Sequence, residues 1–196
     1  MLHVLAGEFR SRILKTPTDD GVTRPMGSRT REGLFNVLRG WFEGARVLDL
    51  FAGVGTLGLE AVSRGAIKVV MVEKDRKIFA LLRDNIESLG CADRAIAVQA
   101  DALGEAAIMA AEPKVNVVLM DPPFALVETD EGLKEVFDQA GRTRKLFLEK
   151  GFLVIRLPTV SDPPPTIEGF DGPEIRAYGN QQNLLLYMPH FESKSK

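Results

Sequence analysis

Four consecutive residues near the middle of the 196-residue chain, Asp121-Pro122-Pro123-Phe124, combine a carboxylate, two prolines and an aromatic ring. They follow an apolar run at residues 115–120 that predicts a buried strand. The prolines end that strand, because they fix φ and carry no N–H. Acceptors beside an aromatic ring suit a planar group with an exocyclic NH₂, whose protons they accept while the ring stacks. The alternative is a strand that ends in a proline-rich turn with a capping Asp.

A second candidate site is the segment Gly53-Val54-Gly55-Thr56-Leu57-Gly58, which matches the pattern G-x-G-x-x-G. It lies between a predicted strand and a predicted helix, where glycines let the chain turn tightly and let a ligand approach the bare backbone. Glu73 follows at the end of the next predicted strand, where its carboxylate is placed to accept hydrogen bonds from ribose hydroxyls. The pattern alone predicts a cofactor that contains a nucleoside, and NAD satisfies it equally well.

Three details favour S-adenosylmethionine over NAD. Asp49 precedes the glycines within Asp49-Leu50-Phe51, and its carboxylate suits an ammonium and a sulfonium group better than a pyrophosphate. Asp101-Ala102, after the third predicted strand, offers a side-chain acceptor and a backbone N–H for adenine. The third detail is the Asp121 segment itself. Taken singly, Asp49, Glu73 and Asp101 are each explained equally well as a helix N-cap or a solvated loop residue. Their positions at successive strand ends predict a cofactor site formed by Asp49, Phe51, Gly53, Gly55, Glu73, Asp101 and Ala102.

The elements that would position these residues alternate between strands and helices. Apolar runs predict strands at 46–51, 68–73, 95–99, 115–120 and 151–156, and helical periods lie at 56–64, 75–89, 103–111, 132–139 and 143–148. Such alternation predicts a parallel sheet with helices on both faces. Two late strands, at 173–178 and 183–188, are joined by too short a link to be parallel. We therefore predict an α/β fold with a mostly parallel seven-stranded sheet and a terminal antiparallel hairpin.

The first 45 residues do not follow this alternation. Residues 2–5 and 9–14 could pair as a hairpin, and an amphipathic helix begins near Ser28. Residues 1–46 carry a net charge of +3, whereas the rest of the chain carries −5. Such asymmetry is typical of a basic binding arm, although an ordinary solvated surface is an equally good explanation. We predict a basic N-terminal extension at 1–45, a catalytic domain at 46–190 and a tail at 191–196.

Composition narrows the class of protein. Apolar residues make up 45% and charged residues 27%, as in ordinary globular proteins. No apolar run approaches the roughly 18–20 residues that span a bilayer, and the N-terminus lacks the pattern of a signal peptide. The single cysteine, Cys91, excludes an internal disulfide and a cysteine-based zinc site. We expect a cytoplasmic protein, monomeric, without a metal ion or a membrane partner.

Over residues 3 to 188 the chain resembles the RsmD-type methyltransferases, which modify the exocyclic amine of a guanine in small-subunit ribosomal RNA. The resemblance rests on these segments: Gly7-Glu8-Phe9-Arg10-Ser11-Arg12-Ile13-Leu14, Arg24-Pro25, Arg29-Thr30-Arg31-Glu32-Gly33-Leu34-Phe35-Asn36-Val37-Leu38, Asp49 to Gly55, Asp121 to Phe124, and Tyr178-Gly179. The chain departs from the family pattern at Met26, where a Thr is usual, and at Ser11, where a Gly is common. Met26 removes a hydroxyl from a loop expected near the active site.

The resemblance implies a class I methyltransferase fold and direct in-line attack of a guanine amine on the methyl group of S-adenosylmethionine. Asp121 and the Pro122 carbonyl would accept the amine protons, and Phe124 would stack on a base lifted out of its helix. The partner would be ribosomal RNA or a small-subunit ribonucleoprotein, with phosphates bound by Arg10, Arg12, Lys15, Arg24, Arg29 and Arg31. For each of these cations singly, a solvated or intramolecular ion-pair role is an equally good explanation.

Three other functions remain open. Methylation of the adenine N6 amine in DNA or RNA uses a similar Asp-Pro-Pro-aromatic motif, but the chain has no room for an added domain that recognises a DNA sequence. An NAD-dependent oxidoreductase would need a hydride-handling site, and the only histidines, His3 and His190, lie near the two ends of the chain. A non-catalytic RNA-binding module would not need both the glycine segment and the Asp121 segment intact.

Overall fold

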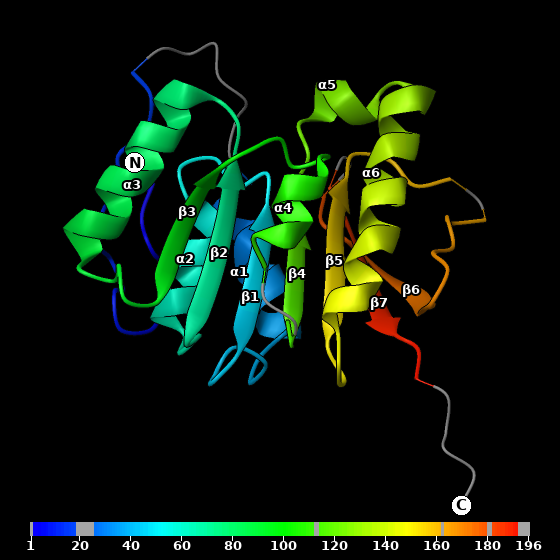
Figure 1. Ribbon diagram of the computed structural model, residues 1–196, viewed down its shortest axis with the longest axis horizontal. Coiled ribbons are helices and arrows are strands. Elements are labelled where there is room, and N and C mark those ends of the chain that lie inside the picture. Colours follow the sequence, from blue (N-terminus) through cyan, green and yellow to red (C-terminus); the bar gives the residue numbers. More distant parts are fainter. Residues whose placement is uncertain (1, 19–25, 112–113, 162, 180–181, 192–196) are drawn as a thin grey trace, which may run out of the picture.

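The computed structural model describes residues 2–18, 26–111, 114–161, 163–179 and 182–191. Its centre is a seven-stranded sheet with the strand order β3-β2-β1-β4-β5-β7-β6 (Figure 1). The strands are β1 (Arg46–Leu50), β2 (Lys68–Glu73), β3 (Ala95–Gln99), β4 (Val117–Met120), β5 (Phe152–Leu157), β6 (Phe170–Ala177) and β7 (Asn183–Pro189). The first five strands pair in parallel, and β7 runs antiparallel between β5 and β6. The predicted fold class is confirmed.

Helices cover both faces of this sheet. They are α1 (Ser28–Val37), α2 (Thr56–Ser63), α3 (Arg76–Leu89), α4 (Glu105–Met109), α5 (Phe124–Val127) and α6 (Asp130–Arg142), followed by the 3₁₀ turn η1 (Thr143–Leu146). In Figure 1, α4 and α6 lie in front of the sheet and α1 and α2 lie behind it. Because side chains alternate along a strand, Val47 joins the hydrophobic core on the side of α1 and α2, whereas Leu48 joins the core on the side of α4 and α6.

The structure corrects several predicted boundaries. The strand β4 begins at Val117 rather than at Val115. The Val115 N–H donates to the Leu146 carbonyl rather than to a neighbouring strand, whereas the Asn116 N–H donates to the Arg46 carbonyl of β1. The helix α6 begins at Asp130, two residues before the prediction, and Thr129 caps it by accepting from the Gly132 N–H at 3.1 Å. The predicted helix at 143–148 is the shorter turn η1, and that at 103–111 is the five-residue α4. The short helix α5 was not predicted.

The N-terminal segment folds back on itself and onto α2. His3 and Ile13 form an antiparallel bridge, and the Val4 N–H donates to the Arg12 carbonyl at 3.0 Å, so the predicted pairing is confirmed, although only as a single bridge. Val4, Phe9 and Leu14 are buried in the same hydrophobic core as Leu34 and Phe35 of α1. Residues of α2 and of the sheet also belong to this core. The extension therefore shares the core of the main sheet.

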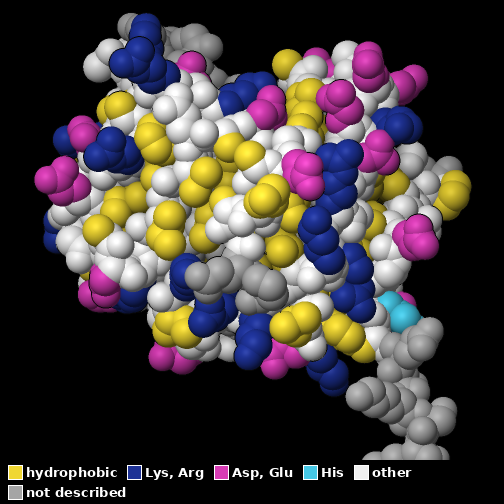
Figure 2. Space-filling view, viewed as in Figure 1, with side chains coloured by type: hydrophobic (Ala, Val, Ile, Leu, Met, Phe, Trp, Pro, Cys, Tyr) yellow, Lys and Arg dark blue, Asp and Glu magenta, His cyan; other side chains and the backbone are white. Residues whose placement is uncertain are grey.

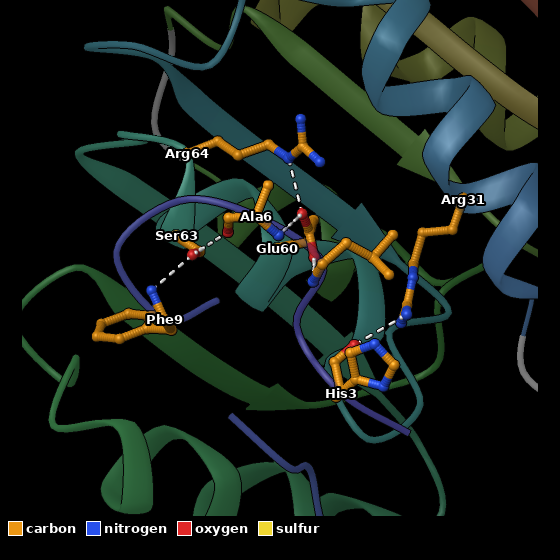
Figure 3. A network of polar contacts seen from close by, with 8 residues as sticks. His3, Ala6, Phe9, Arg31, Glu60, Ser63 and Arg64 are labelled. Carbon is orange, nitrogen blue, oxygen red and sulfur yellow. Dashed lines mark hydrogen bonds and ion pairs between the residues drawn. The ribbon is translucent and has the colours of Figure 1, made fainter. Parts of the chain in front are cut away.

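Figure 3 shows the polar contacts that hold this segment. Glu60 of α2 is fully buried, and its carboxylate accepts from the backbone N–H groups of Leu5 (2.6 Å) and Ala6 (3.1 Å) and from Nε of Arg64 (2.7 Å). Ser63, one turn further along α2, accepts from the Phe9 N–H at 2.9 Å and donates to the Ala6 carbonyl. Side chains of one helix thus satisfy backbone groups that a regular strand would pair with a neighbouring strand.

Candidate active site

The carboxyl ends of β1, β2 and β4 bring three predicted carboxylates together. Asp49 lies within β1, Glu73 ends β2, and Asp121 follows the last residue of β4. Leu50 of β1 lies opposite both Val72 of β2 and Met120 of β4, so the three carboxylates lie at neighbouring strand ends. The negative charges of Asp121 and Glu73 add to the rise that burial causes in the pKa of Asp49. The carboxyl edge of a parallel sheet is where α/β proteins bind their ligands, so the predicted clustering is present.

The glycine segment forms the loop between β1 and α2. Gly53 and Gly55 have φ values of 57° and 91°, which only glycine adopts without strain, and Gly55 caps α2. Gly58 has a different role: a Cβ there would lie 2.5 Å from the Met71 side chain and 3.0 Å from Oδ2 of Asp49. The third glycine of the pattern therefore lets the first turn of α2 pack directly on the sheet.

Asp49 is the most deeply buried of the three carboxylates, with 1% of its surface exposed. Its Oδ2 accepts from the Gly58 N–H at 2.8 Å, whereas its Oδ1 has no hydrogen-bond partner within the described part of the chain. Burial, the largest influence, raises the pKa of Asp49 well above its ordinary value. A buried acceptor without a donor, beside a loop of bare backbone, fits a ligand that brings a cationic donor, as the ammonium group of S-adenosylmethionine would.

Glu73 holds the glycine loop and the start of α3 at the same time. Its Oε2 accepts from the Gly53 N–H at 3.0 Å, and its Oε1 accepts from the Asp75 N–H at 2.7 Å. Each carboxylate oxygen has a second lone pair, so Glu73 can still accept from ribose hydroxyls. Asp75 in turn caps α3 by accepting from the N–H groups of Lys77 and Ile78.

The predicted adenine contact, Asp101-Ala102, lies in the loop after β3. Asp101 is exposed and accepts from the Leu103 N–H at 3.0 Å, and Ala102 is buried. The Ala102 carbonyl accepts from Nε2 of Gln139 at 2.6 Å, and this same amide group donates to the Gly104 carbonyl at 3.1 Å. Gln139 was missed by the sequence analysis. The signal was available, since it is a polar residue on the buried face of α6 beside Val136 and Ala140.

The Asp121-Pro122-Pro123-Phe124 segment turns the chain from β4 into α5. Pro123 is the N-cap of α5 and Phe124 is its first residue, so the ring and the carboxylate are held on one tight turn. Nε of Arg156, on β5, donates to Oδ1 of Asp121, and the Arg156 Cζ lies 4.5 Å from the centroid of the Phe124 ring. Burial raises the pKa of Asp121, and the charge and hydrogen bond of Arg156 oppose that rise.

Three of the predicted phosphate-binding cations lie together on the N-terminal segment. Arg10, Arg12 and Lys15 are all exposed. Two of them also contact α3: Nη2 of Arg12 donates to the Ser88 carbonyl at 2.7 Å, and Nζ of Lys15 lies 2.9 Å from Oδ2 of Asp84. These contacts set the position of the segment but leave both side chains accessible.

The other predicted cations are arranged differently. Arg29 is exposed on α1, whereas Arg31 is only 2% exposed and donates through Nη2 to the His3 carbonyl at 2.9 Å (Figure 3). Arg31 therefore lies inside the protein, apart from Arg10 and Arg12. Arg24 lies outside the described residues. Met26, at the family position where Thr is usual, is buried in the core with 3% of its surface exposed.

Two further observations concern metal binding and membrane insertion. Within the described ranges, no three His, Cys, Asp or Glu side chains are grouped so that they could hold a metal ion. None of the helices in those ranges is both long enough and apolar enough to cross a membrane.

The sheet order, the glycine loop after β1 and the polar residues at the ends of β2, β3 and β4 define the class I methyltransferase fold. The chain belongs to the family described as conserved hypothetical protein 95, whose model matches residues 2–187. The resemblance to RsmD-type methyltransferases that was based on the sequence motifs is thereby confirmed.

Individual relatives agree with this family. The ribosomal RNA small subunit methyltransferase D of Haemophilus influenzae is 36% identical over 128 residues, which cover 63% of this chain and 64% of that protein. The putative rRNA methyltransferase YlbH of Bacillus subtilis is 35% identical, over 63% of this chain and 67% of that protein. The match thus spans less than two thirds of the first relative's length. The solved structure of the putative methyltransferase yhhF of Escherichia coli superimposes with a TM-score of 0.79 at 28% identity, over 96% of this chain and 97% of that one.

Proposed function

We propose that this protein transfers a methyl group from S-adenosylmethionine to the exocyclic N2 amine of a guanine in small-subunit ribosomal RNA. One observation carries the proposal: β1 and β4 are neighbours in the sheet, and Leu50 lies opposite Met120 in their register. The glycine loop after β1 and the Asp121 segment after β4 therefore begin side by side. A loop that suits a nucleoside cofactor is thus adjacent to a turn that suits a planar amine.

The residues that would hold the cofactor lie at the ends of β1, β2 and β3. Gly53 and Gly55 offer bare backbone, Asp49 offers its free Oδ1 to a cationic donor, and Glu73 offers lone pairs to ribose hydroxyls. The Asp101-Ala102 loop, which Gln139 holds in place, would contact the adenine. When bound, S-adenosylmethionine supplies an electrophilic methyl group.

The Asp121 turn offers hydrogen-bond acceptors that would make an aryl amine more nucleophilic. The lone pair of such an amine is delocalised into its ring, which makes the nitrogen a weak nucleophile. Hydrogen bonds from its N–H groups to the Asp121 carboxylate and the Pro122 carbonyl would raise the electron density on nitrogen and fix its direction. Phe124 would stack on the base and hold its plane. Positioning and electrostatics, rather than a strong base, would then account for most of the rate enhancement.

The choice of ribosomal RNA rests on the relatives and on the charge of the surface. Two matched proteins carry rRNA methyltransferase names. Arg10, Arg12 and Lys15 form an exposed basic segment, although the whole chain has a formal net charge of −2. Figure 2 shows acidic side chains gathered where α5 ends and α6 begins. The exposed acids of this region are Glu128, Asp130 and Glu131. Such a surface would repel an arbitrary RNA on one side of the site. We therefore propose a shaped ribonucleoprotein particle as the substrate of a cytoplasmic, monomeric enzyme.

The experiment that tests the proposal is transfer of labelled methyl from S-adenosylmethionine to small-subunit RNA, both free and in particles that lack the modification. Nuclease digestion then identifies the labelled nucleoside. We expect N2-methylguanosine, with the rate reduced about 100-fold to 1000-fold in Asp121→Asn, which removes a charged acceptor. A matched control is Asp171→Asn on the edge strand β6, where the side chain is 62% exposed, which should retain the wild-type rate.

Other outcomes would change the assignment. Label in methyladenosine would replace the proposed substrate by adenine N6. Equal transfer to free RNA and to particles at physiological salt would contradict recognition of a shaped particle. If the protein binds S-adenosylmethionine but labels no RNA, the amine that Asp121 serves belongs to another class of molecule.

A further inference from the structure

Arg156 is a cation that no motif singled out, and it contacts both functional groups of the Asp121 turn. Its Nε donates to Oδ1 of Asp121, and its Cζ lies 4.5 Å from the centroid of the Phe124 ring. The contact follows from the sheet. Met120 lies opposite Ile155 in the parallel pairing of β4 with β5, so the next residues along the two strands, Asp121 and Arg156, meet at the sheet edge.

Both charged groups are largely withdrawn from water. The side chain of Arg156 is 8% exposed and that of Asp121 is 15% exposed. A buried ion pair contributes little net stability, because the desolvation of two charges offsets most of their attraction. The stability of the sheet therefore gives no strong reason for an arginine at the end of β5, where apolar side chains precede it at Leu153, Val154 and Ile155.

The surroundings of Asp121 explain what a cation can do there. Asp49 on β1 is a neighbouring acid, because Leu50 lies opposite Met120 in the pairing of β1 with β4, and the charge of Asp121 adds to the rise that burial causes in the pKa of Asp49. Burial favours the protonated form of Asp121, and a protonated carboxyl is a poorer acceptor for an amine N–H. Arg156, on the opposite side from β1, favours the ionised form. Since Arg156 binds Oδ1, the Oδ2 oxygen is the one left for the substrate.

We propose that Arg156 is a positioning residue for methyl transfer, which fixes the Asp121 carboxylate through Oδ1 and the Phe124 ring through one of its faces. This role rests on the proposed function and adds a residue to it. The base would then stack on the other face of Phe124, and its amine would donate to Oδ2 of Asp121. Arg156 itself does not touch the amine.

The test compares Arg156→Met, which keeps length and removes charge, with Arg156→Lys, which keeps charge and removes the planar fork. The control is Arg176→Met on the edge strand β6, where the ion pair with Glu174 is exposed. We measure kcat and KM for methyl transfer from pH 5 to 9, the affinity for S-adenosylmethionine, and the pH titration of the Asp121 carboxyl carbon by NMR, assigned through its absence in Asp121→Asn.

In Arg156→Met we expect kcat to fall about 10-fold to 100-fold at neutral pH, as for a misplaced catalytic group. The acidic limb of the rate profile should move to higher pH, because removal of the cation raises the pKa of Asp121. Arg156→Lys should restore the position of this limb but only part of kcat. The affinity for S-adenosylmethionine should stay within about 2-fold in all three variants, and Arg176→Met should match the wild type.

An unchanged limb and an unchanged kcat in Arg156→Met would overturn the proposal and leave the contact a structural one. The NMR titration separates this failure from a failure of the proposed function, because it needs no RNA. If no RNA is methylated, a higher titration point for Asp121 in Arg156→Met still supports the positioning role toward the carboxylate, and an unchanged one overturns it.

Discussion

The side-chain amide of Asn85 pairs with the backbone of Lys15: its Oδ1 accepts from the Lys15 N–H at 2.7 Å, and its Nδ2 donates to the Lys15 carbonyl at 3.1 Å. The same Nδ2 donates to the Val54 carbonyl of the glycine loop at 3.0 Å. Asn85 is 1% exposed on α3. One buried amide therefore connects the basic N-terminal segment with the loop that we propose binds the cofactor.

This connection predicts the effect of Asn85→Ala. The substitution leaves the Lys15 N–H and the Val54 carbonyl without their partner, so the free energy of unfolding should fall by about 1–3 kcal/mol. The affinity for S-adenosylmethionine should fall as well, because the loop loses a support. Urea denaturation and calorimetric titration measure the two effects. Asn36→Ala, at an exposed position of α1, is the control and should change stability by less than about 0.5 kcal/mol. Equal stability of the two variants would refute the prediction.

A second prediction concerns Glu60, the buried carboxylate that holds the N-terminal segment on α2. Glu60→Gln replaces one acceptor oxygen by an NH₂ group that would face donors from Leu5, Ala6 or Arg64. We expect the free energy of unfolding to fall by about 3–5 kcal/mol, as when one partner of a buried charged network is lost. Urea denaturation measures this loss.

Limited trypsin digestion reports on the segment itself. If Glu60→Gln releases the N-terminal segment from α2, trypsin should cleave after Arg10 and Arg12 faster than it does in the control variant. The control is Glu32→Gln, at an exposed position of α1. Identical digestion of both variants would mean that the apolar contacts of Val4, Phe9 and Leu14 hold the segment without Glu60.

The third prediction follows from the raised pKa of Asp49. Above the ordinary carboxyl pKa the unfolded chain has lost this proton while the folded protein keeps it, so stability falls as the pH rises from that value to the folded pKa. Asp49→Asn removes the ionisable group and with it this loss of stability at high pH. The side-chain oxygen of the asparagine can still accept from the Gly58 N–H. The substitution should therefore raise the free energy of unfolding at pH 8 by more than about 1 kcal/mol and flatten its pH dependence.

The same variant should lose function. If a cationic group of the cofactor binds Oδ1 of Asp49, its charge should favour the ionised carboxylate and release the Asp49 proton to water. Asp49→Asn should then weaken the binding of S-adenosylmethionine at least about 10-fold, since an ion pair becomes a neutral contact. Denaturation curves at several pH values and calorimetric titration measure both effects, with Asp130→Asn as the exposed control. A variant that is less stable than the wild type at pH 8 would show that burial is not the dominant influence on Asp49.

Sequence patterns were sufficient where local periodicity carries the information. The apolar strands, the amphipathic α3 and the glycine loop after β1 were all predicted, because each signal lies within about 20 consecutive residues. The short helix α5 was missed, because a pair of prolines indicates a turn and does not reveal that Pro123 also caps a helix.

The residues missed at the site share a different cause. Arg156, Gln139 and Asn85 each act on a segment at least 30 residues away, and the partner depends on which strands, helices and loops become neighbours in the fold. The periodicity predicts strands but not the order β1-β4-β5 that places Arg156 against Asp121. Arg31 is the reverse case: it was expected on a basic surface, but the N-terminal segment covers it.

Gly33 on α1 and Tyr178 after β6 illustrate how distant parts of the family pattern depend on each other. Both belong to the segments on which the family resemblance rests, and the structure packs them together: a Cβ on Gly33 would lie 2.1 Å from Cε1 of Tyr178. Glycine is unfavourable within a helix by roughly 0.5–1 kcal/mol relative to alanine, so its presence in α1 needs a reason. The close approach of the Tyr178 ring provides that reason.

This contact predicts a reversal of sign in a double-mutant cycle. Gly33→Ala alone should lower the free energy of unfolding by about 1–3 kcal/mol, because the methyl group overlaps the Tyr178 ring. In a Tyr178→Ala background the overlap is gone, and the same change should raise the free energy of unfolding by about 0.5–1 kcal/mol through helix propensity. Urea denaturation of the four proteins measures the coupling. An equal cost of Gly33→Ala in both backgrounds would mean that Tyr178 moves aside freely and that the glycine is required by another neighbour of α1.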